Sequence, residues 1–162
     1  NAVSINGKLL LGKNGAAAEL GHIPAFGQTQ PCGCGNRGCI EHFASGNYLV
    51  QLQQERFPDT DIQDMFLCHR DKPELINFVD YLSLPIATEI NIFDPDYIII
   101  GGGIPQMNGF PIGLFEKMIR SHTRKPYPEK NLNILYSVPQ QENGVIGAGI
   151  YGFTRLENEE YR

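Results

Sequence analysis

The segment HIPAFGQTQPCGCGNRGC, residues 22–39, constrains the fold of this chain more than any other stretch. It holds three of the four cysteines, Cys32, Cys34 and Cys39, and glycines lie between them. Three neighbouring thiols cannot all pair with one another. The first residues of the chain do not show the charged and apolar pattern of a secretory leader. We therefore expect a reducing, cytoplasmic compartment and a bound metal rather than disulfides.

The spacing H-x9-C-x-C-x4-C offers a metal one imidazole and three thiolates, which is a ligand set typical of tetrahedral zinc. The donors are His22, Cys32, Cys34 and Cys39. Glycine between the thiols lets the backbone turn sharply. Because protein would fill all four zinc positions, we expect a structural ion. Two alternatives remain: His42 could replace His22 as the fourth ligand, or the cysteines could simply be buried in a glycine-rich loop.

Two carboxylates accompany the predicted metal loop. Glu19 and His22 stand three residues apart, which places both side chains on one face of a helical turn. Glu41 follows Cys39 by two residues, so the loop also carries it. Two carboxylates and an imidazole N–H on one wall suit a polyhydroxylated ligand. His22 could then bind zinc through one nitrogen and the ligand through the other. Equally, Glu19 could be solvated and Glu41 could belong to a surface pair.

Composition bounds the class of the protein. The chain has 162 residues, 41% of them hydrophobic and 19% charged, which indicates a globular protein of one domain or slightly more. No apolar stretch approaches the length of a membrane span. The formal charge of −5 argues against direct nucleic-acid binding by this portion.

Apolar periodicity predicts helices that alternate with strands, and hence an α/β fold with a mixed sheet. We expect a hairpin that turns at Asn6-Gly7, a helical turn at 16–19, and helical segments within 39–58 that break near Ser45-Gly46, where Ser45 could cap the second helix. Further helices are expected at 62–69, within 72–95 with a kink or split at Pro85, at 114–124 and at 145–156. A buried strand is expected in DYIIIGGG, residues 96–103, and another strand at 132–138.

These motifs together resemble the ROK family, which groups bacterial sugar kinases with related transcriptional repressors. The E-x-G-H element is Glu19 to His22, and the C-x-C-G-x-x-G-C-x-E element is Cys32 to Glu41. NIFDPDYIIIGGG and GVIGAGIYG are similar to later blocks of the family. The resemblance extends over nearly the whole chain.

The resemblance implies the C-terminal lobe of an actin-like (ribonuclease H-like) ATPase fold over residues 1–162, with an inserted zinc-binding loop at 22–41. It implies that sugar hydroxyls contact Glu19, His22 and Glu41. The zinc ligands it implies are His22, Cys32, Cys34 and Cys39. It also implies that nucleotide lies near the three glycines that follow the predicted strand, Gly101, Gly102 and Gly103. A simple turn between a strand and a helix is the alternative explanation of these three glycines.

The resemblance further implies an ATP-dependent hexose kinase that uses Mg²⁺ and forms a homodimer in many members. The chain opens at Asn1 inside a predicted hairpin, so we expect it to be part of a longer protein. The family's catalytic Asp and its phosphate loops would lie upstream. We therefore expect no catalytic residue and no kinase activity in the isolated chain. A sugar-responsive repressor with an upstream DNA-binding part is the alternative, and a free-standing zinc module would leave the carboxylates unexplained.

Overall fold

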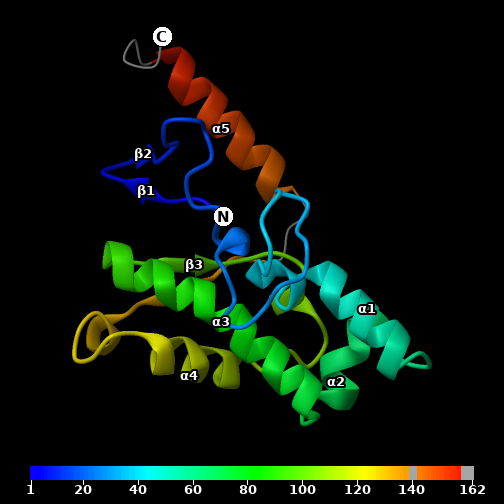
Figure 1. The fold of residues 1–162 in the computed structure, drawn as a ribbon. Helices are drawn as coiled ribbons and strands as arrows, with labels where there is room; N and C mark the ends of the chain where they lie inside the picture. Colours follow the sequence, from blue (N-terminus) through cyan, green and yellow to red (C-terminus); the bar gives the residue numbers. More distant parts are fainter. Residues whose placement is uncertain (139–141, 158–162) are drawn as a thin grey trace.

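A computed structural model describes residues 1–138 and 142–157 of the chain (Figure 1). Helices and short strands alternate along most of it, as expected for the α/β class. The strands are β1 (Ser4–Ile5), β2 (Lys8–Leu9), β3 (Ile98–Ile100) and β4 (Ile134–Tyr136). The α-helices are α1 (Gly46–Arg56), α2 (Met65–His69), α3 (Pro73–Phe93), α4 (Ile112–His122) and α5 (Asn143–Glu157). Shorter 3₁₀ turns occupy Leu20–His22, Ile40–His42, Ile62–Asp64, Ile104–Gln106 and Glu129–Asn131.

The predicted N-terminal hairpin is confirmed. β1 and β2 pair antiparallel, with Ser4 opposite Leu9. Asn6 and Gly7 have φ values of 52° and 77°, and a two-residue turn of this hand needs positive φ at both positions. The hairpin and α5 lie on the opposite side of β3 from α4 (Figure 1).

The main core lies among α1, α2, α3 and α4. Phe66, Phe78 and Phe115 are at most 1% exposed. Phe110 packs edge-on against two of them, with ring centroids 5.0 Å from Phe66 and 5.4 Å from Phe115. Edge-to-face contacts of this kind add to the stabilisation from burial. The core fixes the helical layer against which β3 and β4 rest.

Pro85 does not split its helix, and the alternative, a kink at Pro85, stays a prediction. α3 runs continuously from Pro73 to Phe93 with Pro85 inside it. A proline in a helix interior removes one backbone hydrogen bond and costs about 3 kcal/mol. Here Pro85 is itself buried, and the buried residues Phe78 and Ile90 anchor the helix on either side of it. Packing of the two halves against one core keeps the helix whole.

The strands form two separate pairs, and this corrects the predicted mixed sheet. β3 pairs with β4 in parallel, with Ile99 opposite Leu135, and β1 pairs only with β2. Within residues 1–138 and 142–157, therefore, no sheet contains both parallel and antiparallel pairs. The prediction of a buried strand at β3 is also wrong in part. Ile100 is 7% exposed, whereas Ile99, whose side chain points to the other face, is 70% exposed.

The segment before α1 departs from the prediction at one point. The helical turn expected at 16–19 is absent, because Ala18 has a φ of 65°, outside the right-handed helical region. A 3₁₀ turn begins one residue after Glu19 instead, at Leu20. Farther along, the predicted cap is confirmed: the Ser45 hydroxyl accepts a hydrogen bond of 3.2 Å from the Tyr48 backbone N–H at the start of α1.

The remaining helices agree with their predictions within a few residues. The segment predicted at 62–69 forms a 3₁₀ turn followed by α2, and α4 begins two residues before the predicted start at 114. α5 covers the helix predicted at 145–156. Among the described residues, none of the helices combines the length and the apolar character that a membrane crossing requires.

Candidate metal centre and adjoining carboxylates

Backbone hydrogen bonds fold the cysteine-rich segment back on itself. The Ala25 N–H donates to the Gly38 carbonyl at 2.7 Å, and the Ile40 N–H donates to the Ile23 carbonyl at 2.9 Å. Gly38 has a φ of 70°, and a Cβ there would lie 2.3 Å from the Gln28 carbonyl oxygen. Only glycine fits this position. The folded segment thereby brings Cys39 beside the turn that carries His22.

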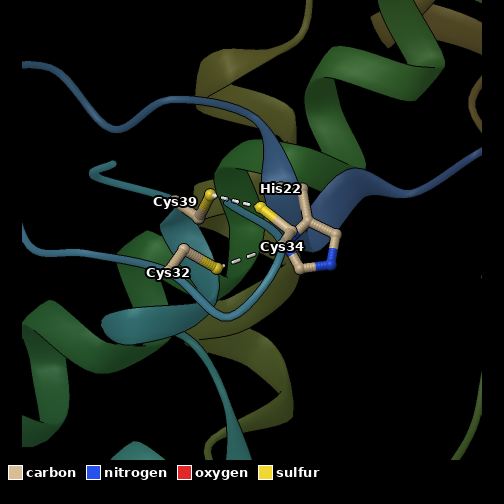
Figure 2. Close-up of side chains that lie close together, drawn as sticks. All are labelled: His22, Cys32, Cys34 and Cys39. Carbon is tan, nitrogen blue, oxygen red and sulfur yellow. Dashed lines mark hydrogen bonds between the residues drawn. The ribbon is translucent and has the colours of Figure 1, made fainter. Parts of the chain in front are cut away.

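The four predicted zinc donors converge (Figure 2). The donor atoms of His22, Cys32, Cys34 and Cys39 all lie within 4.8 Å of one another. The Cys32 Sγ is 3.7 Å from the His22 Nδ1, and the Cys34 Sγ is 3.7 Å from the Cys39 Sγ. Around a tetrahedral zinc with bonds of 2.0–2.3 Å, neighbouring donors stand roughly 3.5–3.8 Å apart. The arrangement therefore fits zinc in position and in donor chemistry.

Local hydrogen bonds and burial tune the three thiols differently. The Cys34 backbone N–H lowers the pKa of Cys32, but Glu41, burial and the neighbouring thiols raise it, and the resulting pKa is about 12. Burial is the main cause of the raised pKa of Cys39. The Asn36 backbone N–H is the main cause of the lowered pKa of Cys34. Cys32 and Cys39 are thus protonated near pH 7 before a metal binds, and binding must release their protons.

The predicted carboxylates lie beside these donors. The Glu19 Oε2 is 3.9 Å from the His22 Nε2, and the Glu41 Oε1 is 3.6 Å from the His22 Nδ1. The Cys32 thiol donates a hydrogen bond of 3.1 Å to the Glu41 Oε1, a contact that the sequence did not predict. The His22 ring therefore turns Nδ1 toward the cysteines and Nε2 toward Glu19. One imidazole can reach a metal and a separate ligand at once.

The structure favours His22 over His42 as the fourth donor. His42 groups with Cys32 and Glu41, but not with Cys34 and Cys39. Cys68 is exposed on α2, and the neighbouring His69 Nε2 lies 2.8 Å from the Thr60 hydroxyl instead. Neither residue takes part in the four-donor cluster.

The three glycines predicted to lie near nucleotide follow β3, and the structure gives each a different position. A Cβ on Gly101 would lie 2.6 Å from the Ser137 Oγ, so glycine permits the close approach of the segment after β4. Gly102 has a φ of 99°, which favours glycine, although a Cβ there would meet no atom within 4 Å. Gly103 has an ordinary helical φ of −69° and caps the 3₁₀ turn at Ile104–Gln106. Only the first two positions therefore call for glycine.

A cavity of about 350 Å³ borders this turn, and one of the three glycines lines it. Gly101 lines the cavity, but Gly102 and Gly103 are not among its described lining residues. The described lining is uncharged and includes Ser137. Sequence reasoning missed Ser137, since only the parallel pairing of β3 with β4 brings it there. The contact of nucleotide with these glycines stays a prediction.

Comparison with known proteins decides the family. Residues 1–151 match the family described as "ROK family". The chain belongs to the ROK family. It is 33% identical over 166 residues to a glucokinase of Thermotoga maritima, an alignment that covers 90% of this chain and 52% of that protein. It is also 31% identical over 147 residues to the transcriptional regulator NagC of Escherichia coli, covering 82% of this chain and 36% of NagC.

A solved ROK structure has the same fold. The ROK hexokinase of Thermus thermophilus superposes with a TM-score of 0.76 at 23% identity, covering 97% of this chain and 54% of that one. The actin-like ROK fold implied by the sequence resemblance agrees with this match. The chain spans between about a third and about half of the length of these relatives. Its family contains both sugar kinases and repressors.

Proposed function

We propose that residues 1–162 form the C-terminal lobe of an ATP-dependent hexose kinase that phosphorylates a sugar 6-hydroxyl. The observation that carries the proposal is the convergence of Glu19, His22 and Glu41 beside a four-donor metal cluster. The kinases among its ROK relatives support the reaction class. The chain would supply one wall of the sugar site, a structural zinc and part of the nucleotide site.

The wall suits a sugar for electrostatic reasons. The Glu19 and Glu41 carboxylates can accept hydrogen bonds from two sugar hydroxyls, and charge-assisted bonds of this type are stronger than neutral ones. The His22 Nε2 can contact a further hydroxyl while Nδ1 faces the cysteines. Zinc, when bound to His22, Cys32, Cys34 and Cys39, would supply cross-linking only, because protein donors fill its four positions.

The phosphoryl-transfer machinery would be shared with the rest of the protein. Gly101 borders a cavity and Gly102 has no Cβ to block access, so nucleotide could approach the backbone between β3 and Gly103. ATP and Mg²⁺ are the cosubstrates expected of a ROK kinase. The aspartate that removes the proton from the sugar hydroxyl would belong to another part of the protein. By itself, the chain would therefore bind sugar weakly and transfer no phosphoryl group.

D-allose is the sugar that we propose first. The segments LGHIP and INIFDPDYIIIGGGI resemble those of D-allose kinase within the family. Epimers differ by the direction of one hydroxyl, and a carboxylate positioned for that hydroxyl discriminates between them. We also propose that the protein is cytoplasmic and that it forms a homodimer. Because the net charge of this chain is −5, we propose that it does not bind nucleic acid itself.

The test is phosphorylation of a hexose panel by the full-length protein with ATP and Mg²⁺. We expect a hexose 6-phosphate and ADP, with kcat/KM lowered about 100-fold by Glu41→Gln, since a charged hydrogen bond contributes about 1.5–3 kcal/mol. Glu55→Gln on the exposed side of α1 is the matched control and should leave the rate unchanged. If the full-length protein phosphorylates none of the hexoses, the proposed kinase activity is wrong. If the isolated 162-residue chain forms product, the expected inactivity of this chain is wrong.

The second candidate is the effector-binding portion of a sugar-responsive repressor. The 31% identity to NagC over 147 residues specifically favours it. The metal centre and the carboxylate wall serve both functions, because each requires sugar binding. If the full-length protein released its operator DNA on adding sugar but formed no ADP, the repressor would be the correct function.

A further inference from the structure

A second group of potential metal donors adjoins the predicted zinc centre. Single donor atoms of Cys32, Glu41 and His42 lie within 4.8 Å of one another. The Cys32 Sγ and the Glu41 Oε1 are 3.1 Å apart. Cys32 belongs to both groups, whereas Glu41 and His42 belong only to this one. The 3₁₀ turn at Ile40–His42 carries both of these residues immediately after Cys39.

His42 has an unsatisfied nitrogen. Its Nε2 is buried and contacts no hydrogen-bond partner among the residues that the structure describes. Buried polar atoms normally have a partner, so an exception in a donor-rich site calls for an explanation. The other two donors of the group are the Cys32 sulfur and a carboxylate oxygen of Glu41. A thiolate, an imidazole and a carboxylate together are a donor set that suits zinc and similar divalent transition metals.

We propose that Cys32, Glu41 and His42 form a second site for a divalent cation of the zinc class, which shares the Cys32 thiolate with the structural site. The second ion binds more weakly than the first, because it has three protein donors and one of them is shared. Among the described residues the group offers no fourth protein donor. The second ion also occupies the carboxylate of Glu41, so excess zinc competes with sugar for this residue. The competition, unlike the second site itself, rests on the proposed function.

The first arm of the test counts zinc ions on the reduced 162-residue chain by titration against a chromophoric chelator. We expect one tight and one weaker site in the natural sequence. His42→Gln keeps a polar side chain but should retain only the tight site, with the second weakened at least about 100-fold. His42→Cys, which restores a ligand, should recover it. The matched control is His122→Gln on α4, where the imidazole pairs with Asp80, and it should keep both sites.

The tight site in His42→Gln also reports that the loop is folded, so a misfolded variant cannot imitate the expected result. A single site in the natural sequence at all zinc concentrations would overturn the proposal. Two unaltered sites in His42→Gln would overturn it as well.

The second arm measures sugar affinity of the full-length protein with one zinc equivalent and with excess zinc. We expect excess zinc to raise the apparent Kd for sugar at least about tenfold in the natural sequence but not in His42→Gln. If two zinc ions bind and sugar affinity does not change, the competition is wrong. If two zinc ions bind and no sugar binds under either condition, the proposed function fails while the second site stands.

Discussion

Glycine has different structural roles in the metal loop at 22–41 and in the turn at 101–103. In the loop, Gly38 lets the backbone reverse so that side chains from separate turns meet within 4.8 Å. After β3, Gly101 makes room for Ser137, and the bordering cavity has no charged side chain among its described lining residues. The loop at 22–41 brings its own donor side chains together. The turn at 101–103 provides only backbone groups and space, so its function depends on the ligand or segment that binds there.

The largest expected effect comes from removing a loop thiol. Cys34→Ser should weaken zinc binding at least about 1000-fold, because a serine hydroxyl is a poor substitute for a thiolate ligand. Hydrogen exchange of residues 22–41 should rise, and sugar affinity of the full-length protein should fall although Cys34 contacts no sugar. Cys68→Ser on α2 is the control and should leave zinc binding, hydrogen exchange of residues 22–41 and sugar affinity unchanged. Unchanged sugar affinity despite demonstrated zinc loss would break the link between loop and sugar site.

The pH dependence of zinc binding tests the thiol environments of the loop. The pKa of Cys32 is about 12 and that of Cys39 is raised above its ordinary value, so zinc must displace at least two protons near pH 7. The apparent zinc affinity should therefore fall about 100-fold for each unit by which pH decreases between 8 and 7. Competition with a chelator of known pH dependence measures it. If the logarithm of the zinc affinity changed by one or less per pH unit, the raised pKa values of Cys32 and Cys39 would be contradicted.

Gly38→Ala tests the backbone of the loop. The new methyl group would meet the Gln28 carbonyl oxygen at 2.3 Å, and φ is 70°, so we expect the zinc-loaded chain to lose about 2–3 kcal/mol of unfolding free energy. Gly33→Ala is the matched control in the same loop, since its Cβ would have no neighbour within 4 Å. Urea unfolding measures both. Equal stability of the two variants would show that the loop does not need the observed reversal.

Gly101→Ala should have the smallest effect. The nearest atom is the Ser137 Oγ at 2.6 Å, a side chain that can move, so we expect a loss of about 1 kcal/mol. Combining it with Ser137→Ala should recover part of the loss, which a double-mutant cycle measures. Gly103→Ala is the matched control, because a Cβ there would meet no atom within 4 Å. A larger loss at Gly101 than at Gly38 would reverse the comparison between the two segments.

The sequence predicted the convergence of His22, Cys32, Cys34 and Cys39, because their spacing is local and each residue type has few other reasons to cluster. It also predicted the hairpin at Asn6-Gly7 and the Ser45 cap, which depend on neighbouring residues alone. Features set by distant contacts were harder to predict. The continuity of α3 through Pro85 depends on core packing at both ends of the helix, and the exposure of Ile99 depends on what covers β3.

The glycine run after β3 shows the same limit. Three identical residues look equivalent in sequence, and all three were predicted to lie near nucleotide. The structure separates Gly101, which lines the 350 Å³ cavity, from Gly102 and Gly103, which are not among the described residues that line it. That difference depends on where β4 and Ser137 come to lie, and neither is close in sequence.

The central claim is that His22, Cys32, Cys34 and Cys39 hold zinc. X-ray absorption spectroscopy of the reduced chain loaded with one equivalent of zinc tests it most directly. The account predicts a first shell of three sulfurs at about 2.3 Å and one nitrogen at about 2.0 Å. A shell without sulfur, or a folded chain that retains no zinc after dialysis, would contradict it.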